Sequence, residues 1–195
     1  ESAWSVISQV TDDLLYRFDQ ACRVKAIEMA SALGMQTDLS INFLPNAVYE
    51  PEACIQATLE VSQRVGWPTH RLIFEITETE EIEDYIFVNK FIQTIKGYGA
   101  RVAIDDFGTG YANFEHIISL DVDFIKIDGS LIRNIDTNSE SQAIAEAIVA
   151  FSQKLGSKTI VEFVHNEAVY EKVKAMGADY SQGYFLGEPS PTINP

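Results

Sequence analysis

Short, nearly continuous apolar runs alternate along this chain with longer segments of helical periodicity. The runs that we interpret as β-strands are residues 39–44, 72–77, 102–107, 123–128, 159–164 and, more weakly marked, 181–186. Unbroken apolar strands are typical of sheets that helices cover on both faces. Repetition of strand, helix and strand predicts right-handed parallel crossovers. We therefore expect an α/β protein with about six strand units, either an open doubly wound sheet or a (β/α)₈ barrel.

The clearest predicted helix spans residues 139–155. Its apolar residues recur at helical spacing and predict one buried stripe, made of Ile144, Ile148, Phe151 and Leu155. Ser139 and Gln142 form a capping-box pattern at its start, and Gly156 stands where a C-cap glycine is expected. Further helices are expected at residues 53–65, 84–98 and over most of the first 33 residues. No glycine-rich phosphate loop follows an early strand, which disfavours an open nucleotide-binding sheet.

Length and charge limit the kinds of protein that this chain can be. With 195 residues it is expected to form a single domain, residues 1–195. The net charge of −15 argues against a nucleic-acid-binding surface and against contact with anionic membranes. Cys22 and Cys54 show no CxxC spacing, and we expect Cys22 to pack as a small apolar residue. Two reduced thiols and the lack of a secretory signal favour a cytoplasmic protein.

The predicted strand at residues 102–107 ends in two adjacent carboxylates, Asp105 and Asp106. The chain then turns through Gly108 and Gly110. Two like charges this close repel each other, and each resists leaving water. A bound cation would remove both costs, so this stretch suggests a metal site.

Polar residues stand near the carboxyl end of nearly every predicted strand. They are Asn42, Glu75, Asp105, Asp106, Lys126, Glu162 and Gln182. In a parallel barrel the carboxyl ends of the strands converge on one face, where active sites lie. A single polar residue in a strand is more often a satisfied buried hydrogen-bonding group. A polar residue that recurs on each of six strands instead favours one shared site.

The chemistry of this set favours hard divalent cations. Five of its members offer oxygen ligands of the kind that Mg²⁺, Mn²⁺ and Ca²⁺ accept: Asn42, Glu75, Asp105, Asp106 and Glu162. The adjacent pair Asp105–Asp106 could hold two ions, an arrangement used in phosphoryl chemistry. Lys126 is the one cation of the set. It could stabilise a developing phosphate charge or, more simply, form a salt bridge with a neighbouring carboxylate.

Several motifs, in order along the chain, resemble those of one known family. They are SINFLPNAVYEP, FEITETE, IDDFGTGYANF, DFIKIDGSLI, VEFVHNE and SQGYFLGEP. From about residue 12 to residue 191 the chain resembles EAL domains, the family of cyclic di-GMP phosphodiesterases. The resemblance implies a TIM-like (β/α) barrel whose first strand runs antiparallel. It also implies hydrolysis of one phosphodiester bond of cyclic di-GMP, which gives linear pGpG.

The resemblance implies roles for particular residues. The metal ligands would be Asn42, Glu75, Asp105, Asp106 and Glu162, and the catalytic residues Lys126, Glu162 and Glu75, with Lys126 positioning the attacking water. The substrate-binding residues would be Gln182, Asp128 and Gly183. The loop after Asp106 would be positioned by Glu78, Phe107 and Gly108. The implied cofactor is Mg²⁺ or Mn²⁺, as two ions, and Ca²⁺ is expected to inhibit.

The chain departs from the family pattern in two ways. The E-A-L motif is absent, and we expect it on N-terminal strands upstream of Glu1. Phe163 stands where the family has glycine, and His165 where it has a glutamate, which could weaken a metal or make activity pH-dependent. These departures leave two alternatives open: a phosphodiesterase, or an inactive EAL domain that binds cyclic di-GMP or another protein in signalling.

The resemblance also implies partners. Family members are commonly homodimers coupled to sensory or cyclase domains. The sequence of residues 12–60 most resembles EAL domains that follow blue-light-sensing flavin modules.

Overall fold

The computed structural model describes residues 3–44, 51–77, 85–108 and 114–192. The chain divides into two compact units. Unit 1 comprises Glu1–Phe74 and Ile82–Ala100, and unit 2 comprises Glu75–Glu81 and Arg101–Pro195. The expectation of a single domain over residues 1–195 stays a prediction.

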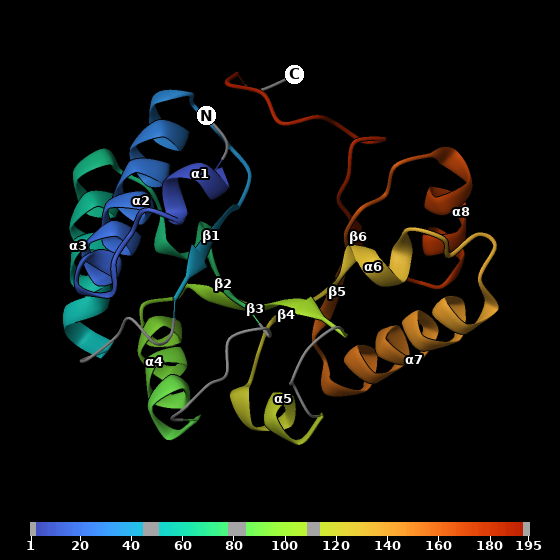
Figure 1. Ribbon diagram of the computed structural model, residues 1–195. Coiled ribbons are helices and arrows are strands. Elements are labelled where there is room, and N and C mark those ends of the chain that lie inside the picture. The colour runs from blue at the N-terminus through green and yellow to red at the C-terminus, as the bar shows by residue number, and fades with distance from the viewer. Residues whose placement is uncertain (1–2, 45–50, 78–84, 109–113, 193–195) are drawn as a thin grey trace. The chain divides into compact units, whose positions relative to one another are not determined.

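Unit 1 consists mainly of helices around the first strands. Its elements are α1 (Ala3–Ile7), α2 (Asp12–Ala32), β1 (Leu39–Phe43), α3 (Pro51–Val65), the 3₁₀ helix η2 (Thr69–Arg71), the start of β2 (Leu72–Thr77) and α4 (Tyr85–Gly97). In Figure 1, α2 and α3 lie side by side. The core contains Phe43 stacked on Phe91, with ring centroids 4.0 Å apart, and Phe74 edge-on to both. Edge-on and stacked rings are the favoured aromatic arrangements, so this cluster fixes β1, β2 and α4 together.

A buried ion pair lies in the same unit. Arg23 and Asp19, one turn apart on α2, are both buried and paired with each other. Arg23 also donates hydrogen bonds to the carbonyl oxygen of Cys54 and to the hydroxyl of Thr58 on α3. Burial raises the pKa of Asp19 although the charge of Arg23 opposes that shift. The guanidinium group thus joins α2 to α3 through several hydrogen bonds.

Unit 2 is built on parallel strands with helical crossovers. Its strands are the end of β2, β3 (Arg101–Phe107), β4 (Phe124–Ile127), β5 (Lys158–Val161) and β6 (Tyr180–Ser181), and its helices are α5 (Phe114–Leu120), α6 (Gly129–Ile132), α7 (Ser139–Leu155) and α8 (Glu167–Ala175). The pairs β3–β4, β4–β5 and β5–β6 are parallel. Strands adjacent in sequence are adjacent in the sheet, β1 beside β2 in unit 1 and β2 to β6 in order in unit 2. The predicted α/β fold with parallel strands is confirmed.

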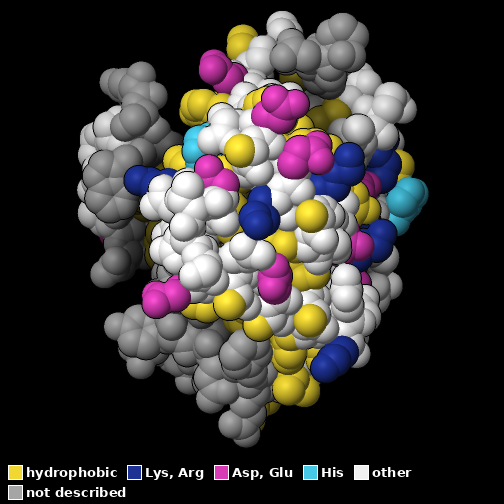
Figure 2. Space-filling model, turned by 90° about the vertical axis from the view of Figure 1, so that its right-hand side faces the viewer, with side chains coloured by type: hydrophobic (Ala, Val, Ile, Leu, Met, Phe, Trp, Pro, Cys, Tyr) yellow, Lys and Arg dark blue, Asp and Glu magenta, His cyan; other side chains and the backbone are white. Residues whose placement is uncertain are grey.

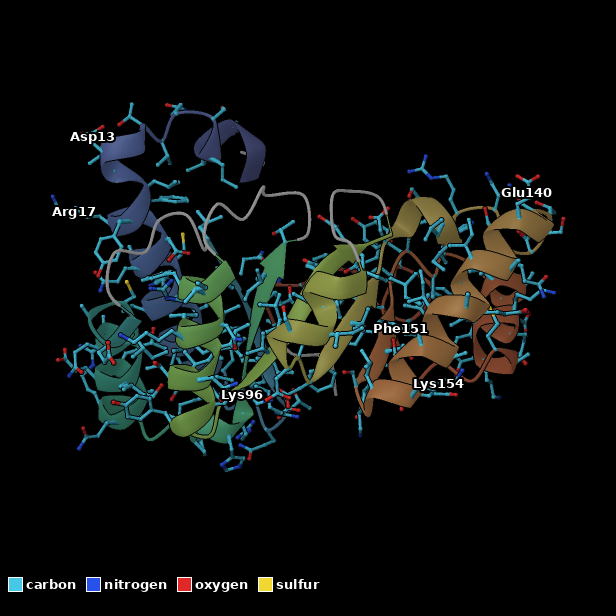
Figure 3. The ribbon with its side chains drawn as sticks, turned by 90° about the horizontal axis from the view of Figure 1, so that it is seen from below. Asp13, Arg17, Lys96, Glu140, Phe151 and Lys154 are labelled. Atoms are coloured by element: carbon cyan, nitrogen blue, oxygen red, sulfur yellow. The ribbon has the colours of Figure 1, made fainter. Side chains whose placement is uncertain are left out.

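Helix α7 begins and ends as the sequence predicts, but its cap and its buried face differ. The N-cap is Asn138, whose side chain accepts from the backbone N–H groups of Glu140 and Ser141, so the Ser139 capping box is wrong. Gly156 has a φ of 79° and ends the helix in the left-handed region, as predicted. In Figure 3, Glu140 lies near the first turn and Lys154 near the last, where each charge complements the helix dipole.

The predicted apolar stripe of α7 is confirmed only in part, because Ile148 is buried and Phe151 is half-buried. Ile144 is 48% exposed and Leu155 is 40% exposed. The buried residues are Ala145, Ile148, Val149 and Ser152. Small side chains at two of these positions let the helix approach β4 and β5 closely, so burial follows the closest approach and not the largest side chains.

The last strand is much shorter than predicted. Residues 181–186 were expected to be extended, but β6 covers only Tyr180–Ser181. After the strand, Gln182 donates to the carbonyl oxygen of Val161 and accepts from the N–H of Val164. The chain then turns, with Leu186 and Gly187 both donating to the carbonyl oxygen of Gly183. The turn places Gln182 and Gly183 next to the end of β5.

Two further surface features bear on the expectations from sequence. Cys22 is exposed, so it does not pack in the core as predicted, whereas Cys54 is buried. Figure 2 shows a face on which lysine and arginine side chains are interspersed with aspartate and glutamate side chains. Among the described helices, none combines the length and the apolar character needed to span a bilayer.

Candidate active site

Lys126 lies at the centre of a cluster of carboxylates in unit 2. Its side chain is buried on β4. The ammonium nitrogen lies 2.8 Å from Oδ1 of Asp105, 2.9 Å from Oε1 of Glu162 and 3.1 Å from Oε2 of Glu75. These carboxylates come from β3, from the end of β5 and from β2. One ammonium group therefore holds together acids from three neighbouring segments.

The strand register explains why these side chains meet. Ile104 on β3 pairs with Ile125 on β4, so Asp105 and Lys126 each directly follow a paired residue, and their side chains meet at 2.8 Å. Side chains at the same level on adjacent strands point to the same face of a sheet. Glu162 follows the last residue of β5, and its N–H continues the ladder by donating to the carbonyl oxygen of Ile127.

A β-bulge explains the adjacent aspartates. The register advances from Ile104 to Phe107 on β3 while it advances only from Ile125 to Ile127 on β4. The extra residue bends the strand, and Asp106 adopts a φ of 56°. A bulge re-aims a side chain that would otherwise point to the opposite face. Asp105 and Asp106 can thus both serve one site, at a backbone cost of about 1–3 kcal/mol.

Three carboxylates are close enough to share a cation. Oxygen atoms of Asp105, Asp106 and Glu162 lie within 4.8 Å of one another, and all three side chains are half-buried. Burial raises the pKa of Asp106, and the negative charges of Asp105 and Asp128 add to that shift. Burial also raises the pKa of Glu162, although Lys126 opposes it. Three carboxylates this close to one another, with the pKa of Asp106 and Glu162 raised by burial, fit a hard divalent cation such as Mg²⁺, Mn²⁺ or Ca²⁺.

Lys126 remains charged in this setting. Burial by itself would lower the pKa of Lys126. The charge of Glu75 and the hydrogen bonds and charges of Asp105 and Glu162 outweigh that effect, so the pKa lies above its usual value. Lys126 is a permanent cation here and not a proton donor.

The structure brings most of the predicted site residues into unit 2. Glu75 contacts Lys126 and is not among the three grouped carboxylates. Asn42 lies on β1 in unit 1 with an exposed side chain, and its role as a ligand stays a prediction. Glu78 lies outside the described residues. Phe107 is buried at the end of β3, and Gly108 has a φ of 106°, where a side chain would be strained and its Cβ would displace Leu131.

A cavity of about 670 Å³ adjoins these carboxylates. Its lining includes Glu162 and all three predicted substrate-binding residues, Asp128, Gln182 and Gly183. Asp128 also caps α6 by accepting from the N–H of Ser130 at 2.8 Å. A Cβ on Gly183 would lie 2.1 Å from the carbonyl oxygen of Val164, so only glycine fits there. The cavity is large enough for a nucleotide-sized ligand.

Sequence reasoning assigned no ligand-binding role to Phe163 or Arg133, which both line this cavity. Phe163 has a φ of 59°, a conformation that suits glycine and costs other residues about 1–3 kcal/mol. The sequence did show a phenylalanine at a family glycine position, which was a usable signal. Nothing in the sequence marked Arg133. His165 lines the same cavity, and its Nδ1 lies 3.0 Å from the carbonyl oxygen of Phe163.

Parallel strands that present carboxylates around a lysine define an α/β protein with a candidate metal-binding site. The chain belongs to the EAL domain family, whose sequence model matches residues 1–189. The predicted resemblance is therefore confirmed. EAL domains have a TIM-like barrel fold.

Comparisons with individual proteins also place this chain among EAL domains. The chain is 35% identical to cyclic di-GMP phosphodiesterase PdeF of Escherichia coli over 157 residues, 80% of this chain and 21% of that protein. It spans about a fifth of the length of the curated relatives that it matches. It is 40% identical, with a TM-score of 0.94, to a standalone EAL protein from Vibrio cholerae in its c-di-GMP-bound form, over 100% of this chain and 82% of that one.

A second solved structure bears on the metal. The chain is 27% identical, with a TM-score of 0.87, to BlrP1 of Klebsiella pneumoniae, over 94% of this chain and 47% of that one. BlrP1 was solved as a manganese and cyclic di-GMP complex and also as a calcium and cyclic di-GMP complex. Divalent cations thus occur together with the dinucleotide in a related protein.

Proposed function

We propose that this chain catalyses the metal-dependent hydrolysis of cyclic di-GMP to linear pGpG. One observation carries the proposal: Lys126 and the carboxylates of Glu75, Asp105 and Glu162 lie within hydrogen-bonding distance in a member of the EAL domain family. The relatives named as cyclic di-GMP phosphodiesterases support the choice of substrate.

Asp105, Asp106 and Glu162 would hold the metal, Mg²⁺ or Mn²⁺ and two ions in all, with Glu75 and Asn42 as further ligands. Bound divalent cations would stabilise the charge on the scissile phosphate and lower the pKa of the attacking water. Lys126 would orient that water, since its ammonium group is held in place by three carboxylates. A preorganised cation costs little to reorganise during the reaction.

The cavity next to the carboxylates would bind the dinucleotide. Gln182 offers an amide, and Gly183 lets the backbone approach closely without a side chain in the way. Asp128 lies near enough to Asp106 for its charge to raise the pKa of Asp106, so it would act as a supporting acid beside the metal.

The decisive experiment is turnover of cyclic di-GMP by the chain with Mg²⁺ or Mn²⁺. We expect linear pGpG as the product, inhibition by Ca²⁺, and no turnover by Glu75→Ala. Glu60→Ala, an exposed carboxylate of α3 outside unit 2, is the matched control and should retain activity. Product formation by Glu75→Ala would refute the assigned site.

A second candidate function is a non-catalytic module that binds cyclic di-GMP and passes on a signal. The departures at Phe163 and His165, both of which line the cavity, favour it. This alternative predicts dinucleotide binding with no product under any divalent cation. Binding and turnover measured on the same sample therefore distinguish the two.

The setting of this activity is also a proposal. We expect a cytoplasmic protein that forms homodimers and is coupled to a sensory or cyclase domain. The much greater length of the curated relatives supports coupling to further domains. A blue-light-sensing flavin module remains our specific proposal for the sensor.

A further inference from the structure

Phe163 occupies an unfavourable conformation without a compensating place in the core. Its φ of 59° lies in the left-handed region, and its side chain is 42% exposed. Non-glycine residues persist in this region where the surrounding structure imposes it, and such residues cluster at ligand-binding sites. Because much of the ring is exposed, its burial contributes little stability to offset the backbone strain. Its position on the cavity wall points to a role in ligand binding.

The ring of Phe163 lies against Gly129, the first residue of α6, and against Arg133, which directly follows that helix. The guanidinium carbon of Arg133 lies 4.8 Å from the ring centroid, a cation–π arrangement. Gly129 makes room for the ring, since a Cβ there would lie 2.7 Å from Cβ and 3.2 Å from Cγ of Phe163. Phe163 and Arg133 thus form a cation–π pair, which we call the Phe163–Arg133 stack, and Gly129 leaves room for it.

The cavity has two chemically different parts. Glu162 and Asp128 supply acids, and Glu162 belongs to the carboxylate group that can hold a cation. Phe163 and Arg133 supply an aromatic ring and a planar cation. A nucleotide has the complementary division, with a phosphate that divalent cations bind and a flat base that stacks on aromatic rings and guanidinium planes.

We propose that the Phe163–Arg133 stack binds a guanine base of the dinucleotide while the phosphate lies at the carboxylates. This inference rests on the proposed function and names a base-positioning residue within it. Arginine suits guanine in particular, because its parallel N–H groups match the O6 and N7 acceptors of that base. Adenine presents a donor at the corresponding position and would bind less well.

The test is the affinity of the full chain for a fluorescent cyclic di-GMP analogue in Ca²⁺, where turnover is not expected. Phe163→Ala should weaken binding by about 5-fold to about 100-fold, the range for loss of one base–aromatic stack. Phe163→Tyr should retain binding. Phe163→Gly removes the ring and also relieves the backbone, so it should bind as weakly as Phe163→Ala while unfolding at a higher temperature.

Kinetics provide an independent readout. In Mn²⁺, Phe163→Ala should raise KM by a similar factor and leave kcat within about two-fold, as expected for a residue that binds the base and does not touch the reacting atoms. Arg133→Lys keeps the charge but loses the planar group, and it should reduce the preference for cyclic di-GMP over cyclic di-AMP. Tyr180→Ala is the matched control, because Tyr180 is an exposed ring with Lys158 at 5.4 Å and does not line the cavity.

Three results would overturn the inference. Unchanged affinity in Phe163→Ala would exclude stacking on this ring. Equal losses in Phe163→Ala and Tyr180→Ala would indicate a general structural effect. A wild-type chain that neither binds nor hydrolyses cyclic di-GMP would remove the proposed function together with this inference, whereas if only the stacking inference is wrong, the wild-type chain still hydrolyses cyclic di-GMP.

Discussion

The ammonium nitrogen of Lys126 lies 2.8 Å from Oδ1 of Asp105, and neither side chain is more than 15% exposed. Buried charges are tolerated only when they are paired, and here one cation serves three carboxylates. We therefore expect changes at Lys126 to affect both the stability of the chain and the proposed reaction.

Replacing Lys126 with methionine should abolish turnover and destabilise the metal-free chain. The carboxylates lose their shared cation, and breaking a buried pair costs about 3 kcal/mol of unfolding free energy. Urea unfolding in a chelator measures the loss. Lys158→Met, an exposed lysine on β5, is the control and should cost less than about 1 kcal/mol. Full turnover by Lys126→Met would show that our role for the lysine is wrong.

The pH dependence of stability should depend on metal. Burial raises the pKa of both Asp106 and Glu162, so the folded chain holds their protons more tightly than the unfolded chain does. Stability from these groups is therefore present below the ordinary carboxyl pKa of about 4 and is lost as pH rises through their raised values.

A divalent cation should stabilise the chain more as pH rises, because it competes with protons for the carboxylates of Asp106 and Glu162. Thermal unfolding across this pH range, with chelator and with Mn²⁺, should show that stabilisation by metal grows as pH rises. In Asp106→Asn one of the two titrating groups is gone, so the chelator profile should be flatter. A stabilisation by Mn²⁺ that does not vary with pH would contradict the expectation.

Gly183→Ala should damage the cavity wall. The new Cβ would lie 2.1 Å from the carbonyl oxygen and 2.4 Å from the nitrogen of Val164, and backbone atoms cannot move aside as a flexible side chain can. We expect a loss of about 2 kcal/mol or more in unfolding free energy. Gly187→Ala, four residues later with nothing within 4 Å of the added carbon, is the control. Equal stability of the two variants would argue against this close approach.

Arg23→Met tests the buried ion pair of unit 1. Asp19 would keep a buried carboxyl group without its partner, which costs about 3–5 kcal/mol for a pair of this kind. Arg64→Ala breaks the exposed pair of Arg64 with Glu28 and should cost at most about 1 kcal/mol. Chemical denaturation of both variants gives the comparison. A small loss in Arg23→Met would mean that Asp19 is protonated in the native state and needs no partner.

Much of the fold could be read from the sequence because it depends on local patterns. The apolar run at residues 72–77 became β2 with the predicted bounds, and α7 begins and ends where periodicity and Gly156 indicated. The acids at the strand ends were visible for the same reason, since a carboxylate stands out in an apolar run. The position of β2 along the chain follows from its own residues.

Tertiary structure decided which groups meet and how they are aimed. The bulge at Asp105 and Asp106 depends on the register between β3 and β4, which no single segment encodes. The position of Lys126 between acids of three segments, and of Phe163 against Gly129, arises in the same way. Even in α7, contact with β4 and β5 decided which of its apolar residues are buried. Local periodicity determines the elements, whereas register and packing involve residues far apart in the chain and are fixed only when those elements come together.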